Sequence, residues 1–268
     1  MLVAMPLWQF GLIILVALLV AGIGGLLLHR WRSSRSPKTT DEEQGGQEGY
    51  LVSAVLGLFA LLLGFTFALA VDRFDTRRVL VLDEANAIGT TYLRTQLLEA
   101  PHRERISALL VAYTNNRLAL ANAPRPVPHE MLAKNDELIT QLWQATVAAF
   151  PTIRGYDFSS SYLESMNTVI DLDASRKAAR LAHVPTEVFV VLAIYGTGAA
   201  FVLGYVLTGW RSRVAGTFLL ALFTLSLLLI IDIDQPGTGG IRESQGPMER
   251  LQKSFAESPP EVFDHPPN

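Results

Sequence analysis

The chain has 268 residues, half of them hydrophobic, and a formal net charge of −3. A charge this close to neutral gives no basic surface for nucleic acid, so we expect no nucleic-acid partner. The chain contains no cysteine, which excludes disulfides, thiolate metal sites and cysteine nucleophiles.

Four stretches of the chain carry no charged residue, namely 7–28, 50–71, 188–209 and 214–231. A helix needs about 20 apolar residues to cross the hydrocarbon of a bilayer. Backbone in lipid must form a helix or a closed barrel, and none of these stretches shows the alternation typical of barrel strands. The sequence therefore predicts four transmembrane helices in a lipid bilayer. The first is expected to be a retained anchor, because no Lys or Arg precedes it as in a signal peptide.

The predicted fold is all-α: four transmembrane helices with a helical extramembrane domain inserted between spans 2 and 3. The insert keeps apolar residues at steps of three and four, such as Ile106, Leu110 and Tyr113, which indicates helices. One helix is expected to run from residue 50 to about 98. The predicted segments are transmembrane helix 1 (1–28), a polar linker (29–49), transmembrane helix 2 (50–71), the helical domain (72–185), transmembrane helix 3 (186–209), transmembrane helix 4 (214–231) and a polar tail (232–268) with a disordered end.

Basic residues suggest which side of the membrane the insert occupies. The two connections that share a side carry Arg30, Arg32, Arg35, Lys38, Arg211 and Arg213. The positive-inside rule puts such connections in the cytoplasm, so it favours an outward-facing insert. Basic residues beside the insert argue for the opposite side, namely Arg73, Arg77, Arg78, Arg176, Lys177 and Arg180.

Small residues recur along one side of two predicted spans. They are Ser53, Gly57, Gly64 and Ala68 in the second span, and Gly196, Ala200 and Gly204 in the third. Lipid gives no hydrophobic drive for helix association, so small side chains are the usual means of close contact. These residues are expected either to pack helices within the monomer or to form a subunit or pore-facing surface.

Polar residues gather where the second and third spans meet the insert. They occur at helical spacing as Asp72, Asp75, Asp83, Asn86 and Thr90 before the insert, and as Asn167, Asp171 and Ser175 near its end. Two such stripes are predicted either to meet in a polar network or vestibule, or to be ordinary solvated helix faces.

Two carboxylates, Asp232 and Asp234, end the fourth span and precede a glycine-rich segment. Carboxylates and loop carbonyls together can hold calcium, although topology alone would also place acids there. No other cofactor is expected. The histidines show no metal-binding spacing, and the sequence has no HExxH, GxSxG or phosphate-binding glycine loop, so no catalytic residue and no enzyme activity are predicted.

The segments GLFALLLGFTFALAVDRFDTRR, DEANAIGTTYLR and DIDQPGTGGIRESQ resemble the bacterial bestrophin-like family of unknown function, over about residues 50–248. Similarity to true bestrophins is more distant. It implies a homo-oligomeric anion channel whose long helices continue into a cytoplasmic domain, with calcium on an acidic segment after the last span, where Asp232 and Asp234 lie. The second span departs from bestrophins, because it lacks their aromatic and proline-rich neck.

The leading prediction is therefore a homo-oligomeric ion channel or pore for an inorganic ion. The alternative is a membrane-anchored sensor or scaffold whose helical domain binds a partner or a ligand.

Overall fold

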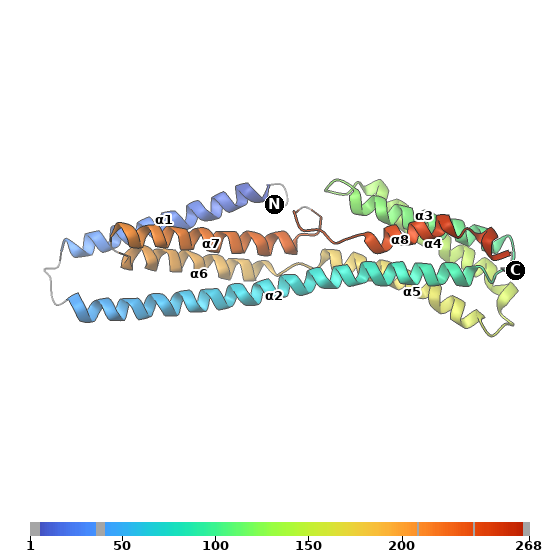
Figure 1. Cartoon of the computed structure of the whole chain (residues 1–268), viewed down its shortest axis with the longest axis horizontal. Coiled ribbons are helices and arrows are strands. Elements are labelled where there is room, and N and C mark those ends of the chain that lie inside the picture. Colours follow the sequence, from blue (N-terminus) through green and yellow to red (C-terminus); the bar gives the residue numbers. More distant parts are fainter. Residues whose placement is uncertain (1–5, 36–40, 208, 238, 265–268) are drawn as a thin grey trace. The chain divides into compact units, whose positions relative to one another are not determined.

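The computed structural model describes residues 6–35, 41–207, 209–237 and 239–264, with the side chains of 41–48 and 51 outside that description. Within these ranges every regular element is a helix (Figure 1), so the all-α prediction is confirmed. The elements are α1 (Leu7–Ser33), α2 (Asp41–Thr95), α3 (His102–Asn122), α4 (His129–Ile153), α5 (Ser159–Leu181), α6 (Thr186–Val206), α7 (Trp210–Asp234), α8 (Gly246–Glu257) and the 3₁₀ helix η2 (Pro260–Asp264).

Four helical segments in the described chain are long and apolar enough to cross a membrane, which confirms the four predicted spans. They are Leu7–Ser33, Val52–Thr95, Ser159–Val206 and Trp210–Asp234. The third segment joins α5 to α6, and its uncharged run is α6 after Glu187. The chain therefore supplies α1, the first part of α2, α6 and α7 to the membrane.

The helices extend beyond the predicted spans. α1 continues to Ser33 and α2 begins at Asp41, within the predicted 29–49 linker, while residues 36–40 lie outside the described residues. Extending an existing helix fixes one residue per hydrogen bond, which is far less costly than starting a new helix. The helix α7 likewise includes 210–213, which we expected to be a loop. Gly209, the N-cap residue just before this helix, has φ 93°, a conformation that favours glycine.

The C-terminal tail contains α8 (Gly246–Glu257) and the 3₁₀ helix η2 (Pro260–Asp264), whereas its composition predicted a disordered end. The helix α8 buries Met248 and Phe255, and the Phe255 ring packs on Tyr92 with 4.4 Å between centroids. Arg103 Nη1 lies 2.5 Å from Asp264 Oδ1. An apolar residue every three or four positions gives α8 a face to bury, which offsets the disorder expected from the Pro-rich sequence. Residues 265–268 lie outside the described chain.

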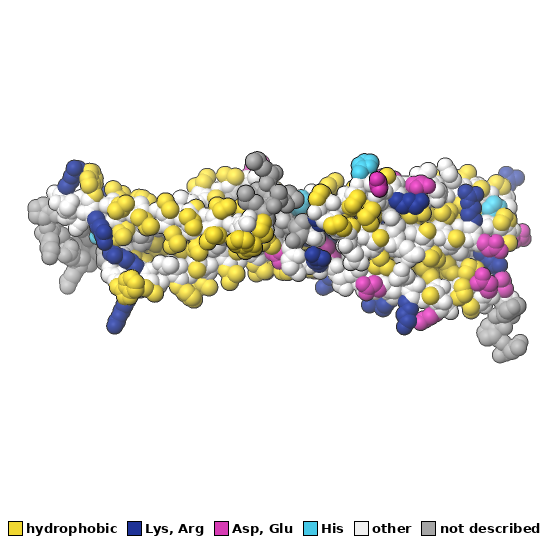
Figure 2. Space-filling view, turned by 90° about the horizontal axis from the view of Figure 1, so that it is seen from above, with side chains coloured by type: hydrophobic (Ala, Val, Ile, Leu, Met, Phe, Trp, Pro, Cys, Tyr) yellow, Lys and Arg dark blue, Asp and Glu magenta, His cyan; other side chains and the backbone are white. Residues whose placement is uncertain are grey.

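The chain forms two compact units. Unit 1 comprises 1–72, 183–235 and 239–241, and unit 2 comprises 73–182, 236–238 and 242–268. In unit 1, α1 and α6 approach very closely: a Cβ atom added to Gly204 would lie 1.8 Å from the carbonyl oxygen of Gly22. Figure 2 shows hydrophobic side chains over much of the visible face of unit 1, and Phe65, Ile194 and Phe218 are among those exposed. This surface suits lipid rather than water.

Unit 2 is a helical bundle with its own core. Helices α3 and α4 pack together, and α8 packs on α3. Its most buried apolar side chains include Ile88, Ile106, Leu110, Leu142 and Met166, each fully inaccessible to solvent. The core thus draws on α2 to α5, and these helices also place the charged groups described next.

Candidate functional site

A network of charged side chains is buried inside the core of unit 2. Glu84 of α2 is completely inaccessible to solvent. Its carboxylate accepts hydrogen bonds from the Tyr113 hydroxyl at 2.6 Å, from Arg117 Nε at 3.2 Å and from Arg176 Nη1. A carboxylate is tolerated in a protein core only when it is paired and hydrogen-bonded, and here two guanidinium groups and a phenol meet that requirement.

A second buried carboxylate, Asp173 of α5, continues the network toward the surface. Its Oδ1 accepts hydrogen bonds from Asn135 Nδ2 at 2.8 Å and from Arg117 Nη1 at 3.3 Å. Its Oδ2 lies 2.6 Å from the Lys177 ammonium, which also contacts Asp136 at 2.6 Å. Four helices, α2 to α5, are therefore tied together by alternating charges.

Burial and the neighbouring charges shift the pKa values of three groups in the network, Tyr113, Arg117 and Arg176. Burial, followed by the nearby Glu84 carboxylate, raises the pKa of Tyr113 well above its usual value, so the phenol stays protonated. Burial lowers the pKa of Arg176, and Glu84 partly offsets it. For Arg117, burial also acts to lower the pKa, but the attraction of Glu84 and other neighbours outweighs it, and the pKa is raised.

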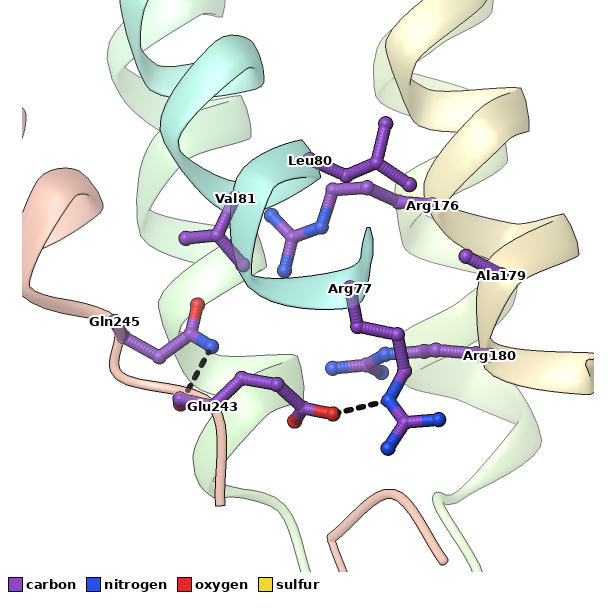
Figure 3. Close-up of a pocket in the computed structure, with 8 residues that line it drawn as sticks. All are labelled: Arg77, Leu80, Val81, Arg176, Ala179, Arg180, Glu243 and Gln245. Atoms are coloured by element: carbon purple, nitrogen blue, oxygen red, sulfur yellow. Dashed lines mark hydrogen bonds and ion pairs between the residues drawn. The ribbon is translucent and has the colours of Figure 1, made fainter. Parts of the chain in front are cut away.

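A small cavity next to this network is lined by arginines. It has a volume of about 10 Å³ for a water-sized group, and Arg77, Arg176, Arg180 and Glu243 lie around it (Figure 3). Arg77 Nε donates to Glu243 Oε1 at 2.5 Å. Burial, and then repulsion from Arg125, lowers the pKa of Arg180 to about 10. Positive charge therefore exceeds negative charge at this cavity.

The predicted polar stripes lie elsewhere. Each predicted residue is exposed in the single chain: Asp72, Asp75, Asp83, Asn86, Thr90, Asn167, Asp171 and Ser175. The buried polar groups are instead their neighbours in sequence, among them Glu84 beside Asp83. The structure therefore leaves these two stripes exposed and does not join them in one network within the chain.

The residues of the buried network lie at core positions of the sequence pattern, although we did not predict the network from the sequence. Tyr113 and Arg117 continue the apolar stripe of Ile106 and Leu110. Asp173 and Arg176 similarly follow the buried residues Met166 and Val169 of α5 at helical spacing. Charged residues of both signs at core positions of several helices point to buried pairing, because an unpaired charge there is too costly.

The two stripes of small residues occupy different environments in unit 1. Gly196, Ala200 and Gly204 of α6 face inward: Gly196 and Ala200 are buried, and Gly204 touches the backbone of α1. The stripe on α2 is exposed along its length, at Ser53, Gly57, Gly64 and Ala68. No atom lies within 4 Å of where a Cβ of Gly57 or Gly64 would be.

The two carboxylates predicted for calcium each bind backbone amides in unit 1. Asp232 accepts hydrogen bonds from the amides of Gly240 at 2.8 Å and Ile241 at 3.2 Å. Asp234 accepts one from the Val184 amide at 2.9 Å. Among the described residues no group of three or more His, Cys, Asp or Glu side chains is arranged to hold a metal ion. Calcium binding at these two residues stays a prediction.

Known proteins match this chain over nearly its whole length. The profile of the Bestrophin-like domain family matches residues 6–248. A crystal structure of a bacterial bestrophin homolog from Klebsiella pneumoniae carrying a tryptophan-to-alanine mutation has a TM-score of 0.70 and 14% identity, covering 97% of this chain and 99% of that one. Another structure of the homolog, solved by Zn-SAD phasing, gives 0.65 and 15%, with coverage of 96% and 99%. No curated protein matches in sequence. At this identity, the two crystal structures establish the fold alone.

Proposed function

Because the chain belongs to the Bestrophin-like family, we propose that it is one subunit of a homo-oligomeric membrane channel for an inorganic ion. In this proposal α2 faces the neighbouring subunits or the pore. The membrane is a bacterial inner membrane, and the helical domain lies outside it, as the basic connections favour.

The observation that carries the proposal is the two-sided character of α2 in unit 1. One side, with Phe59, Leu63 and Ala70, is buried, and the Phe59 ring packs edge-on against Phe223 at 4.9 Å. At 100° per residue, the small residues Gly57 and Gly64 lie on roughly the opposite side of the helix. A lipid-facing side has no need for small residues, whereas close approach of a second helix does.

The exposed side of α2 changes character along the helix. Steps of three and four residues lead from Ala68 to Asp72 and Asp75, and then from Val79 to Asp83 and Asn86. All of these residues are exposed. In the membrane segment this side is apolar, with small residues on either side of the exposed Leu61, and beyond it the side is polar. Such a surface fits a pore-lining helix, because an ion meets polar groups where it enters or leaves.

The test is single-channel recording from purified protein in planar bilayers, with Gly64→Leu as the variant. No atom of the same subunit is within 4 Å of the new Cβ position, so the subunit should fold. The added side chain should nevertheless reduce the current at least about tenfold or dissociate the oligomer, by blocking close approach. Gly198→Leu is the matched control, because Gly198 lies on membrane helix α6, is exposed and has equally open surroundings. It should leave the current unchanged.

Two outcomes would contradict the proposal. Bilayers that stay silent with a well-folded oligomer would refute channel activity, and an equal effect of both leucine variants would refute the role of the α2 surface. A sensor or scaffold, the alternative from the sequence, predicts a stable partner that is retained by Gly64→Leu. Recovery of the same partner by both variants, together with silent bilayers, would favour that function.

A further inference from the structure

We propose that the cavity at Arg77, Arg176 and Arg180 in unit 2 binds a monatomic monovalent anion, of which chloride is the abundant example. The ion adds negative charge next to Arg180, for which no described carboxylate lies within ion-pair distance. This inference is independent of the proposed channel function, because it concerns the interior of the helical domain and not a conduction path.

The first argument is the balance of charge. Glu84 pairs with Arg176, and Glu243 pairs with Arg77 at 2.5 Å. In the part of the chain that the structure describes, no carboxylate lies within the 4 Å ion-pair distance of Arg180. Arg125 adds further positive charge, since it lies close enough to lower the pKa of Arg180. Arg180 is therefore left without a carboxylate at close range, and a monovalent anion beside it would offset this positive charge.

The second argument is the position and size of the cavity. Figure 3 shows the Arg176 and Arg180 side chains extending from α5 toward α2 and the segment that carries Glu243. Its volume of about 10 Å³ is close to what a single water molecule needs. A monatomic ion is compatible with that size after a small shift of the flexible arginine side chains. A phosphate or a carboxylate group is too large.

The third argument is the energetic state of Arg180. With a pKa of about 10, the Arg180 guanidinium is still charged at neutral pH. Burial and the neighbouring arginines therefore destabilise the form that Arg180 has under these conditions. An anion at the cavity would interact with Arg180 and Arg77 together and offset that destabilisation. It would thereby join α2, α5 and the segment before α8.

The experiment measures the line width of the ³⁵Cl resonance of sodium chloride in the presence of full-length protein in detergent micelles. Binding to the protein broadens the line, and bromide should compete. Melting temperature is recorded in parallel in sodium chloride and in sodium gluconate at equal ionic strength. Chloride should raise Tm by about 2–4 °C at a concentration of about five times Kd.

The variant Arg180→Gln removes the excess charge. It should abolish the excess line broadening and make Tm equal in the two salts. The control is Arg78→Gln, because Arg78 is an exposed arginine of α2 that is 3.8 Å from Asp75, and it should keep both effects. A purely structural role for Arg180 would instead lower Tm in both salts and leave the difference between them intact.

A second variant keeps the proposal testable if Arg180→Gln does not fold. Glu243→Gln removes the carboxylate that pairs with Arg77 and whose charge also acts on Arg180, which should tighten chloride binding at least about fivefold, since the excess of positive charge at the cavity then increases. Absence of broadening with folded wild-type protein, or unchanged broadening in folded Arg180→Gln, would overturn the proposal and indicate a water molecule in the cavity.

Discussion

Replacing Glu84 with glutamine tests whether the buried network stabilises unit 2. The substitution keeps the shape and one acceptor oxygen but removes the negative charge between Arg117 and Arg176. Arg117 retains Asp173 at 3.3 Å, whereas Arg176 loses its carboxylate partner and is almost fully buried. Breaking a buried pair from one side typically costs about 3–5 kcal/mol. Because glutamine still accepts a hydrogen bond, we expect about 3 kcal/mol.

Urea unfolding of the full-length protein in detergent micelles measures this loss. Trp143 lies on α4 of unit 2, so its fluorescence reports on that unit once the other three tryptophans are replaced by phenylalanine. The matched control is Glu137→Gln, which disrupts the half-exposed pair with Lys134 at 3.0 Å. Exposed pairs contribute about 0–1 kcal/mol, so this control should change little.

A double-mutant cycle separates pairing from packing. Arg176→Met combined with Glu84→Gln removes one charge of each sign and leaves Arg117 paired with Asp173. The double variant should therefore be about 2 kcal/mol more stable than the sum of the single losses predicts. Additive losses, or a loss for Glu84→Gln no larger than for Glu137→Gln, would refute the idea that charge pairing stabilises this core.

Three further predictions concern unit 1 and its membrane setting. Gly204→Ala should abolish folding of the membrane unit, seen as aggregation in size-exclusion chromatography, because its Cβ would lie 1.8 Å from the Gly22 oxygen; normal elution would contradict this. Asp232→Asn should lower the free energy of unfolding by about 1–2 kcal/mol, because it weakens the hydrogen bonds that the carboxylate accepts from backbone amides. A rise of Tm with calcium in the wild type, but not in this variant, would support the predicted calcium site. Reporter fusions at Ser34 and Arg125 should place the first inside the cell and the second outside; the reverse result would contradict the predicted orientation.

The membrane part of the fold could be predicted because lipid acts locally on the sequence. Each span must satisfy its own backbone hydrogen bonds, so the four uncharged runs alone identified α1, the first part of α2, α6 and α7. The ends were harder to predict, since α7 runs from Trp210 to Asp234 and includes flanking charged residues.

The candidate sites could not be predicted to the same extent, because they depend on which helices meet. Glu84 and Asp83 are adjacent acids in the sequence, yet one is completely buried and the other is exposed. The choice depends on Arg117 and Arg176, which lie on other helices. The arginine cavity was equally hidden, since Glu243 meets Arg77 only after the tail returns to unit 2. Helical spacing marks Arg117 and Arg176 as core positions, but it does not indicate which distant charges pair with them.

The charges that remain exposed on α2 lead to a prediction about the ion. Glu84 and Arg77 are buried and paired within the subunit, so neither is available to a pore. On the exposed side, Asp75 has Arg78 at 3.8 Å, whereas Asp72 and Asp83 have no ion pair within 4 Å among the described residues.

In a homo-oligomer with α2 facing the pore, these two aspartates repeat in every subunit as rings of negative charge, and such rings select cations. The bestrophin resemblance implies anion selectivity, so reversal potentials in a potassium chloride gradient distinguish the two. We expect cation preference, and a permeability ratio reduced about twofold or more in Asp83→Asn, because one of the two unpaired carboxylates is lost. Glu164→Gln, an exposed acid on α5, is the control. Anion preference that Asp83→Asn leaves unchanged would refute the placement of this side of α2 at the pore.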